Sequence, residues 1–261
     1  MIFQDRFKDK IAIVTGAAQG IGKGVAERIA KEGAKTVLVD RSDVVLEVAE
    51  NLKKEGYNVI AVQADLETLE GFEKVSNRAI ETFGKIDILI NNVGGTIWAK
   101  PFQHYQEDEI IKEVSRSLFP TLWGCSSVLP NMIANGGGVI VNVSSVATRS
   151  VNRVPYAAAK GGVNAITASL AFEQAANNIR VIGVAPGGTE APQRIIPRNE
   201  NTQTEEEKMW YQQIVDQTRE SSLQKKYGAI DDQVSTILFA ASDEAKYITG
   251  VTIPVAGGDL G

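Results

Sequence analysis

The sequence is poor in the residues that form disulfides, metal clusters and histidine-based catalytic sites. Its 261 residues include one cysteine, Cys125, and one histidine, His104. A single cysteine excludes an internal disulfide and a cysteine metal cluster. A zinc site or a Ser-His-Asp triad would have to be built around one histidine, which argues against both. We therefore expect no metal cofactor, and chemistry carried by other side chains.

An excess of positive charge and a long apolar run are also missing. The 27 lysines and arginines are outnumbered by 32 aspartates and glutamates, so the formal net charge is -5. That balance argues against a nucleic-acid partner, which requires a basic footprint. No apolar run approaches the roughly 20 residues that span a bilayer, and residues 1–6 lack the apolar core of a signal peptide. We expect a cytoplasmic protein that binds a small molecule, not nucleic acid or a membrane.

Short apolar runs alternate with helical patterns along the chain. With 43% hydrophobic residues the chain can bury a substantial core, and we predict one α/β domain over residues 1–261. Apolar runs that end in glycine or polar residues are typical of strands buried on both faces of a parallel sheet. The repeated strand–helix order predicts a doubly wound parallel sheet flanked by helices. The predicted strands are residues 11–14, 36–39, 59–62, 86–90, 139–143, 180–184 and 251–255.

The first predicted strand runs into a glycine-rich turn. Residues 15–22 read TGAAQGIG and are followed by a helical pattern. Glycines there let the backbone bend sharply and approach a pyrophosphate, which binds the free N–H groups at the helix start. Asp40 ends the second strand about 20 residues later, where a carboxylate can hold a ribose 2′-hydroxyl. The pattern predicts NAD. Arg41 is a competing signal, because arginine at this point can accept the 2′-phosphate of NADP.

A tyrosine and a lysine stand four residues apart in the run YAAAK, residues 156–160. On a helix, this spacing places both side chains on one face. An ammonium group close to a phenol favours the phenolate, which can act as a base. The spacing therefore predicts a tyrosine base assisted by a lysine. Taken alone, it is equally compatible with an ordinary helix surface.

Residues 189–222 interrupt the strand–helix order. They contain two prolines, a long polar run and the aromatic pair Trp210 and Tyr211. Irregular segments of this length in a compact α/β domain are often loops that cover a site. We therefore predict that this lid segment (residues 189–222) is mobile and covers the site.

Motifs spread over nearly the whole chain resemble the short-chain dehydrogenase/reductase family. They are the turn at 15–22, Asp40, Asp65, residues 91–94, Ser144-Ser145, residues 156–160 and Pro186-Gly187. The resemblance implies a Rossmann-type fold, a homotetramer and hydride transfer to a nicotinamide cofactor. It implies that Tyr156 is the base, that Lys160 stabilises the phenolate and holds the nicotinamide ribose, and that Ser145, or else Ser144, holds the substrate oxygen. The cofactor-binding residues that it implies are Gly16, Gln19, Gly20, Ile21, Gly22, Asp40, Asp65, Asn92, Gly94, Tyr156, Lys160, Pro186, Gly187 and Thr189.

One catalytic position departs from the family pattern. The family has a helix asparagine that holds a water in the proton relay, and counting back from residues 128–130 places this position at Ser117. Either the shorter serine replaces the asparagine, or the proton leaves by another route. The departure also leaves open a non-catalytic, dinucleotide-sensing protein, although such a protein would need neither Tyr156 nor Lys160.

Four stretches resemble, within this family, the benzoate cis-diol dehydrogenases. They are residues 91–101, 145–149, 187–192 and 255–261. Enzymes of this group act on 1,6-dihydroxycyclohexa-2,4-diene-1-carboxylate in aromatic-acid breakdown. The resemblance thus implies NAD-dependent oxidation of this diol to catechol with release of CO2. The alternative is another secondary alcohol, a sugar or a cis-dihydrodiol without the carboxylate.

A carboxylate substrate calls for a cation, and the planar fork of arginine suits a carboxylate best. Two arginines, Arg149 and Arg153, lie between the serine pair and the tyrosine, and two more, Arg194 and Arg198, lie in the lid segment. We expect one of the four to bind the carboxylate, with Arg149 slightly preferred. The candidates for walls of an aromatic-ring pocket are Trp98, Trp123, Trp210 and Tyr211, although core packing is the favoured interpretation for any single one of them.

Overall fold

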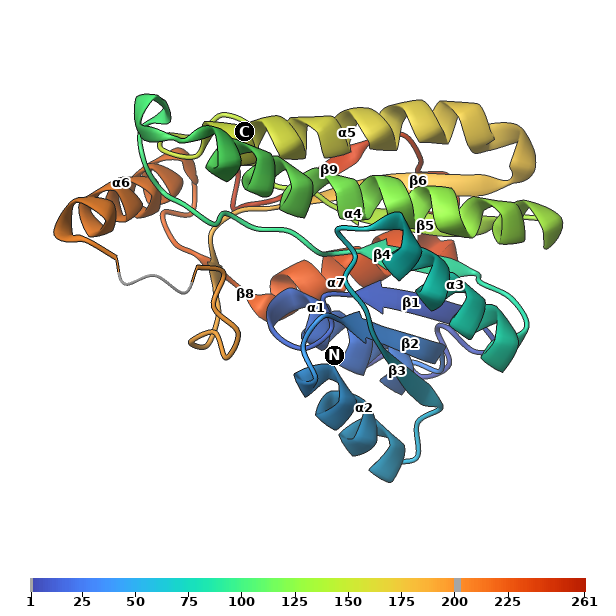
Figure 1. Cartoon of the computed structure of the whole chain (residues 1–261). Helices are drawn as coiled ribbons and strands as arrows, with labels where there is room; N and C mark the ends of the chain where they lie inside the picture. The colour runs from blue at the N-terminus through green and yellow to red at the C-terminus, as the bar shows by residue number, and fades with distance from the viewer. Residues whose placement is uncertain (1, 200–202) are drawn as a thin grey trace.

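The centre of the molecule is a seven-stranded sheet in the order β3-β2-β1-β4-β5-β6-β9 (Figure 1). The computed structural model describes residues 2–199 and 203–261. Every neighbouring pair of strands in this sheet is parallel. The strand order reverses between β1 and β4, which is where open α/β sheets bind their ligands. The predicted doubly wound parallel sheet is therefore confirmed.

All seven predicted strands are present, with small shifts at their ends. The fourth begins at Ile88 rather than Ile86, although the N–H of Asp87 still donates to the carbonyl oxygen of Ile11 at 2.9 Å. The strands are β1 (Ile11–Thr15), β2 (Lys35–Asp40), β3 (Val59–Gln63), β4 (Ile88–Asn91), β5 (Gly138–Val143), β6 (Ile179–Pro186) and β9 (Thr252–Val255).

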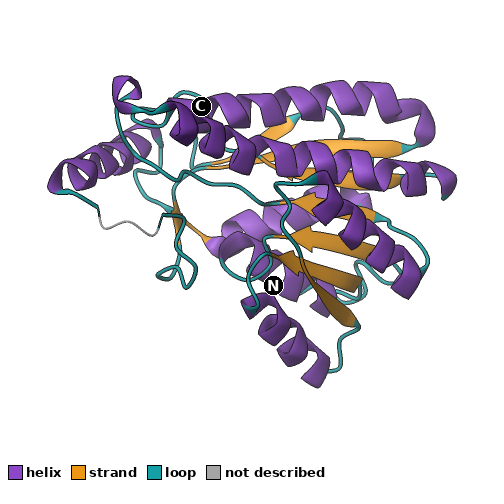
Figure 2. Ribbon diagram, viewed as in Figure 1, coloured by secondary structure: helices purple, strands orange, loops and turns teal. Residues whose placement is uncertain are grey.

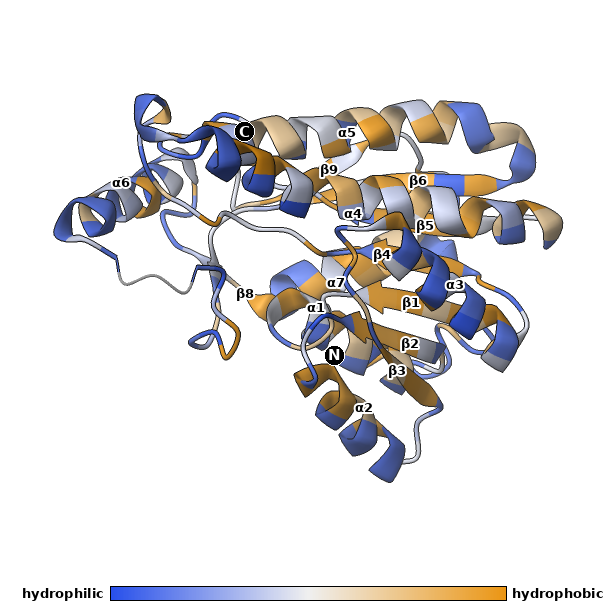
Figure 3. Ribbon diagram, viewed as in Figure 1, coloured by the Kyte–Doolittle hydropathy of each residue, from blue (hydrophilic) through white to orange (hydrophobic). Residues whose placement is uncertain are grey.

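Helices cover both faces of the sheet (Figure 2). Alternate strand residues point to opposite faces, so that Ala12 and Val14 pack on one side and Ile13 packs on the other. The strands are accordingly the apolar centre of the molecule, and the outer helix surfaces are polar (Figure 3). One face carries α1 (Gly20–Lys31), α2 (Val44–Lys54) and α7 (Ile230–Ala241), and the other carries α3 (Leu69–Phe83), α4 (Glu107–Ala134) and α5 (Val154–Gln174).

Residues 2–199 and 203–261 also contain the short 3-10 helices η1 (Phe102–His104), η2 (Ala175–Asn177) and η3 (Asp243–Ala245). None of the helices in the described part of the chain combines the length and the apolar character that crossing a membrane requires.

The lid segment is more regular than predicted. It starts with β7 (Thr189–Glu190), which pairs with β8 (Gly228–Ala229), and it contains the helix α6 (Glu205–Ser221). A capping box starts α6: the Thr204 hydroxyl accepts the N–H of Glu207, and the Glu207 carboxylate accepts the N–H of Thr204. Figure 1 shows α6 projecting beside the three layers. Residues 200–202 of the predicted lid, and Met1 of the predicted N-terminal stretch, lie outside the described residues.

Candidate active site

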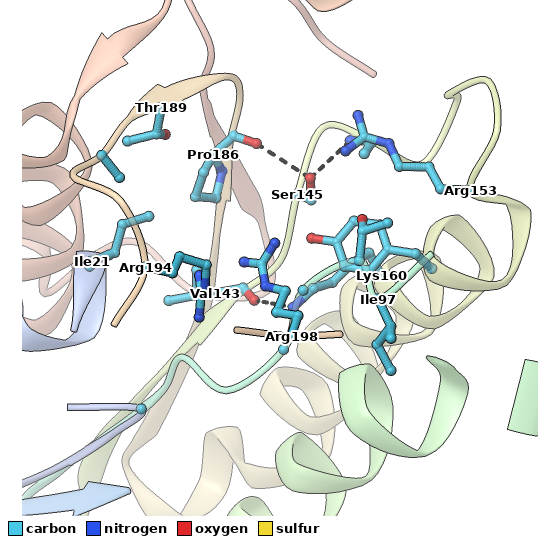
Figure 4. Close-up of a pocket in the computed structure, with 18 of the residues that line it drawn as sticks. Ile21, Ile97, Val143, Ser145, Arg153, Lys160, Pro186, Thr189, Arg194 and Arg198 are labelled. Atoms are coloured by element: carbon cyan, nitrogen blue, oxygen red, sulfur yellow. Dashed lines mark hydrogen bonds between the residues drawn. The ribbon is translucent and has the colours of Figure 1, made fainter. Parts of the chain in front are cut away.

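A cavity of about 950 Å³ opens at the carboxyl ends of the strands (Figure 4). Most of the site residues predicted from the sequence line it, whereas Gly22 and Ser117 are not among the described residues that do so. A cavity of this size accommodates a large ligand. The predicted residues that line it are Gly16, Gln19, Gly20, Ile21, Asp40, Asp65, Asn92, Gly94, Ser144, Ser145, Arg149, Arg153, Tyr156, Lys160, Pro186, Gly187 and Thr189.

The glycine-rich turn forms an open cradle at one side of this cavity. Gly16 and Gly20 have φ values of +67° and +61°, which favour glycine, and a Cβ on Gly20 would meet nothing within 4 Å. A Cβ on Gly22 would lie 2.1 Å from the carbonyl oxygen of Gly16, so the turn packs directly on α1. No side chain caps the start of α1. Its first N–H groups are therefore available to an anion.

Asn92 braces the glycine-rich turn from the neighbouring strand. Its side-chain amide donates to the carbonyl oxygen of Thr15 at 3.0 Å, and its backbone N–H donates to the Thr15 hydroxyl at 2.8 Å. The Thr15 hydroxyl in turn donates to the carbonyl oxygen of Ile90 at 3.1 Å. Asn92 thus lines the cavity, but its side chain is committed to holding β1 and β4 together at the turn.

The carboxylate of Asp40 is held at the edge of the cradle by two backbone groups. Its two oxygens accept the N–H groups of Ala18 and Ser42, each at 3.1 Å. Arg41 beside it is exposed and also lines the cavity. The open space at Gly20, the uncapped helix and the fixed carboxylate fit a dinucleotide whose ribose hydroxyls face Asp40.

Helix α5 brings the predicted tyrosine and lysine to the opposite side of the cavity. Both are buried, and the Lys160 Nζ atom lies 5.9 Å from the centroid of the Tyr156 ring. Nζ donates to the carbonyl oxygen of Val143 at 2.7 Å. Burial lowers the pKa of Lys160 to about 7, and the positive charge of Arg198 adds to this effect. The pair is therefore on one helix face, as the spacing predicts.

The two candidate serines differ in what their hydroxyls contact. The Ser144 hydroxyl is bonded to Asn164 Oδ1 at 2.6 Å and to the carbonyl oxygen of Lys160 at 3.1 Å, so it is turned into α5. The Ser145 hydroxyl accepts the N–H of Ala147 at 3.1 Å, and its proton has only a long contact, 3.4 Å, to the carbonyl oxygen of Pro186 at the cavity wall (Figure 4). This difference favours Ser145 as the residue that holds a substrate oxygen.

Ser117 lies on α4, fully buried behind the cavity wall. Its hydroxyl accepts the N–H of Gly95 at 3.3 Å. A Cβ on Gly94 would lie 3.0 Å from Lys160 Nζ and 3.6 Å from the Cα of Ser117, so Gly94 fills the space between the serine and the lysine. The role of Ser117 in a proton relay stays a prediction.

Among the predicted arginines, Arg153 lies closest in chain and space to the tyrosine. Its guanidinium carbon is 5.8 Å from the Tyr156 ring centroid, and its Nε donates to the Ser150 hydroxyl at 2.6 Å. Burial lowers the pKa of Arg153, an effect opposed by the nearby tyrosines. Arg149 is exposed at the rim of the cavity. The geometry therefore favours Arg153 over the initially preferred Arg149.

The four aromatic candidates for a ring pocket differ in their position relative to the cavity. Tyr211 lines the cavity, whereas Trp98, Trp123 and Trp210 are not among the described residues that do so. Trp210 stacks on His104 with the ring centroids 5.2 Å apart, and it fixes α6 to the loop that precedes α4. Tyr211 is thus the candidate that lines the cavity, whereas the Trp210 ring packs against His104 instead.

Tyr227 is a cavity residue that the sequence reasoning missed. Its ring lies against the backbone of Gly188, where a Cβ would come within 2.5 Å of the ring carbons. Burial and the proximity of Tyr211 raise the pKa of Tyr227, while Arg153 opposes the rise. Tyr211, Tyr227 and Arg153 thus gather at one end of the cavity. The glycine at 188, which follows Pro186-Gly187, is the only sequence signal that points to this packing.

Comparisons with known proteins agree with the fold and the arrangement of the site. The model of the family described as short chain dehydrogenase matches residues 10–235. Among solved structures, a protein from Sinorhizobium meliloti proposed to be a short-chain alcohol dehydrogenase superposes with a TM-score of 0.83, at 31% sequence identity over 97% of each chain. The likeness therefore extends over nearly the entire fold.

Curated relatives act on several kinds of alcohol. The 1,6-dihydroxycyclohexa-2,4-diene-1-carboxylate dehydrogenase of Pseudomonas putida is 61% identical over 98% of this chain and 94% of its own. The enzyme of the same name from Acinetobacter baylyi is 58% identical over 98% of both chains. By contrast, the 7alpha-hydroxysteroid dehydrogenase of Bacteroides fragilis is 34% identical over 97% of this chain and 95% of its own.

Proposed function

The chain belongs to the short chain dehydrogenase family, and from this premise we propose that it oxidises 1,6-dihydroxycyclohexa-2,4-diene-1-carboxylate with NAD as the hydride acceptor. The observation that carries the proposal is the convergence of Tyr156, Lys160 and Ser145 on the cavity that also contains the dinucleotide cradle. The names of the two relatives at 58% and 61% identity supply the substrate.

NAD is favoured over NADP by the position of Asp40. Its carboxylate is fixed by two backbone N–H groups and cannot turn away without losing them. A 2′-phosphate at about 4 Å would cost up to about 4 kcal/mol per unit of charge at an effective dielectric constant of about 20. Arg41 offsets part of this cost, but it is exposed and screened by solvent.

The residues of this chain orient the diol and take up its proton. Ser145 holds the oxygen of the secondary ring hydroxyl, and Tyr156 removes its proton. Lys160 stabilises the resulting negative charge and would hold the ribose next to the nicotinamide. The glycine-rich turn and Asp40 would hold the rest of the NAD, which would supply the hydride acceptor for the same ring carbon.

The product of this step explains why the reaction proceeds to an aromatic ring. Loss of a hydride and a proton converts the secondary alcohol into a ketone, which lies β to the carboxylate. A β-keto acid loses CO2 readily, and the enol that remains becomes catechol. The protein therefore has to perform only the hydride transfer.

The carboxylate is held by Arg153 in this proposal. Arg153 is half-buried, next to the Tyr156 ring, and near the rings of Tyr211 and Tyr227. A guanidinium forms two parallel hydrogen bonds to a carboxylate, and the two phenol rings offer flat apolar walls to a six-membered ring. The arginine thus sets the acid group at the far end of the cavity and leaves the ring hydroxyl beside Tyr156.

A homotetramer is part of the proposal, by analogy with the family. Large apolar side chains are exposed on adjacent helices: Phe172 on α5 is 91% exposed, and Ile111 on α4 is 56% exposed. Burial of such side chains against other copies of the chain would remove them from water. We expect light scattering after size-exclusion chromatography to give four times the mass of the chain, and a mass of one chain would contradict the expectation.

A panel of cis-diols with and without the carboxylate tests the function. We expect NADH formation with the carboxylated diol, accompanied by stoichiometric CO2 release, and much weaker activity on the diols that lack the acid. Equal activity on neutral diols or sugars would favour a different dehydrogenase. Binding of NAD with no turnover on any diol would favour a dinucleotide sensor.

A further inference from the structure

The glycine-rich turn and the lid segment are joined directly by one side chain. Gln19 Oε1 accepts the backbone N–H groups of Ile195 and Ile196 at 3.0 and 3.3 Å, and Gln19 Nε2 donates to the carbonyl oxygen of Ile196 at 3.0 Å. These three bonds span 176 and 177 residues of sequence. We call this contact the Gln19 clasp. It holds residues 195 and 196 beside the start of α1.

The Gln19 clasp leaves the start of α1 without a side-chain cap. Gln19 is the N-cap residue, yet its side chain makes no capping bond to the helix, because it is used by the lid segment. The first N–H groups of α1 stay free for the pyrophosphate, and Ile195 and Ile196 lie directly beside them. The partly buried Ile196 also packs against the apolar core, which fixes the lid segment at this point.

An arginine stands on each side of the clasped residues, and both line the cavity. The Arg194 Nε donates to the carbonyl oxygen of Ile196 at 3.2 Å. The Arg198 guanidinium lies flat on the backbone of Gly95, where a Cβ would be 2.3 Å from its Cζ. Arg198 thus lies near both Arg194 and Lys160 in the cavity (Figure 4).

The two arginines repel each other across the cavity. Burial and the charge of Arg198 lower the pKa of Arg194 to about 10, while the carboxylate of Asp40 opposes this effect. Among the described residues, Arg198 forms no ion pair, although its charge lowers the pKa of Lys160 and opposes the rise in the pKa of Glu113. An anion placed between the two arginines would reduce this repulsion.

We propose that Arg194 and Arg198 are ligands of the cofactor pyrophosphate, and that the Gln19 clasp, which ties residues 195 and 196 to the glycine-rich turn, holds them in the cavity. The pyrophosphate carries two negative charges, and each arginine offers it a charge-assisted hydrogen bond. Binding of the dinucleotide would therefore hold residues 194–198 more firmly against the glycine-rich turn.

Calorimetric titration with ADP-ribose and with AMP tests the arginines. ADP-ribose contains the pyrophosphate and lacks the nicotinamide. We expect R194A and R198A each to weaken ADP-ribose binding by about tenfold, and the double variant by more. AMP, which lacks the second phosphate, should respond less. R78A, which removes an exposed arginine on α3, is the matched control and should bind both ligands as the parent protein does.

Limited digestion with trypsin provides a second readout. Cleavage after Arg194 and Arg198 should slow when ADP-ribose is added, and Q19A should be cleaved faster than the parent protein without ligand. If both arginine variants bind ADP-ribose with unchanged affinity, the proposal is overturned. A raised KM for the carboxylated diol alone would then assign the arginines to the substrate. Both assays are independent of which alcohol is oxidised.

Discussion

The Nζ atom of Lys160 donates a hydrogen bond to the carbonyl oxygen of Val143 at a distance of 2.7 Å. This bond ties the lysine of α5 to the carboxyl end of β5, directly before the serine pair. The lysine is therefore held against the sheet, and its distance to the Tyr156 ring is set by two rigid elements rather than by a loop.

Tyr156→Phe should remove the base without removing the cofactor. We expect kcat to fall by about 100-fold to 10,000-fold, because the hydroxyl acts on the reacting proton, while the affinity for NADH changes little. Steady-state kinetics and NADH fluorescence titration measure the two effects. Comparable losses in both would contradict the role of Tyr156 as the base.

Lys160 should make the stability of the cofactor-free protein depend on pH. Its pKa is about 7 in the folded protein and ordinarily 10.5. Between these values the unfolded chain binds a proton that the folded chain has lost. The free energy of unfolding should therefore rise with pH above about 7, by at most about 1.4 kcal/mol per pH unit. Urea unfolding from pH 7 to 9 measures this slope, and Lys160→Met should reduce it.

Ionisation of Glu113 should have the opposite effect on the free energy of unfolding, at lower pH. It is fully buried on α4 and accepts the N–H groups of Ile97 and Trp98, and burial raises its pKa from 4.5 to about 7. Between these values the folded chain holds a proton that the unfolded chain has lost, so stability should fall as pH rises. Glu113→Gln should abolish this fall, because the amide accepts hydrogen bonds and does not titrate.

Glu113→Ala tests whether the hydrogen bonds accepted by Glu113 stabilise the fold, by comparison with Glu113→Gln. It leaves the N–H groups of Ile97 and Trp98 without their acceptor, at a cost of about 1–3 kcal/mol for each buried group. We expect lower stability than for Glu113→Gln at every pH. If the two variants unfold at the same urea concentration, the carboxylate does not hold this part of the cavity wall.

The variants Ser144→Ala and Ser145→Ala should distinguish the structural role of Ser144 from the catalytic role of Ser145. Ser145→Ala removes the hydroxyl that faces the cavity and should lower kcat by about tenfold to a hundredfold, with a smaller loss of stability from the unpaired N–H of Ala147. Ser144→Ala removes the bonds to Asn164 and to the Lys160 carbonyl and should mainly lower the free energy of unfolding, by about 1 kcal/mol per bond. The reverse pattern would make Ser144 the residue that holds the substrate oxygen.

Arg153→Gln should change the preference between acids and neutral diols. Loss of the guanidinium should raise KM for the carboxylated diol by about tenfold to a hundredfold, while a neutral cis-diol is affected little. Arg149→Gln is the matched comparison, because Arg149 is exposed at the rim of the same cavity. An unchanged ratio of the two KM values in Arg153→Gln would remove this residue from the carboxylate site.

The fold was predictable because its signals are local. Each strand is a continuous apolar run, and the glycine-rich turn, Asp40 and the Tyr156–Lys160 pair are short motifs at strand ends or on one helix. A parallel sheet brings its carboxyl edges together whatever the loops contain. Local patterns were therefore enough to place these residues around one cavity.

The parts that were not predicted depend on contacts between distant residues. The choice between Ser144 and Ser145 depends on Asn164, and the position of Tyr227 depends on the missing Cβ of Gly188. The Gln19 clasp joins residues 176 positions apart. The helix α6 was missed because its sequence is mostly polar, with Trp210 and Ile214 as its buried residues. Contacts between residues so far apart in the chain leave no periodic pattern in the sequence.

The pairing of β7 with β8 places the two ends of the excursion between them side by side, with the N–H of Gly228 donating to the carbonyl oxygen of Gly188 at 2.9 Å. Because β7 and β8 lie outside the seven-stranded sheet, the stretch between them can differ in sequence without changing the pairing of that sheet. A graft of the corresponding stretch from a steroid-oxidising relative should therefore leave the main sheet intact, provided that it keeps the contacts of Gln19 with residues 195 and 196.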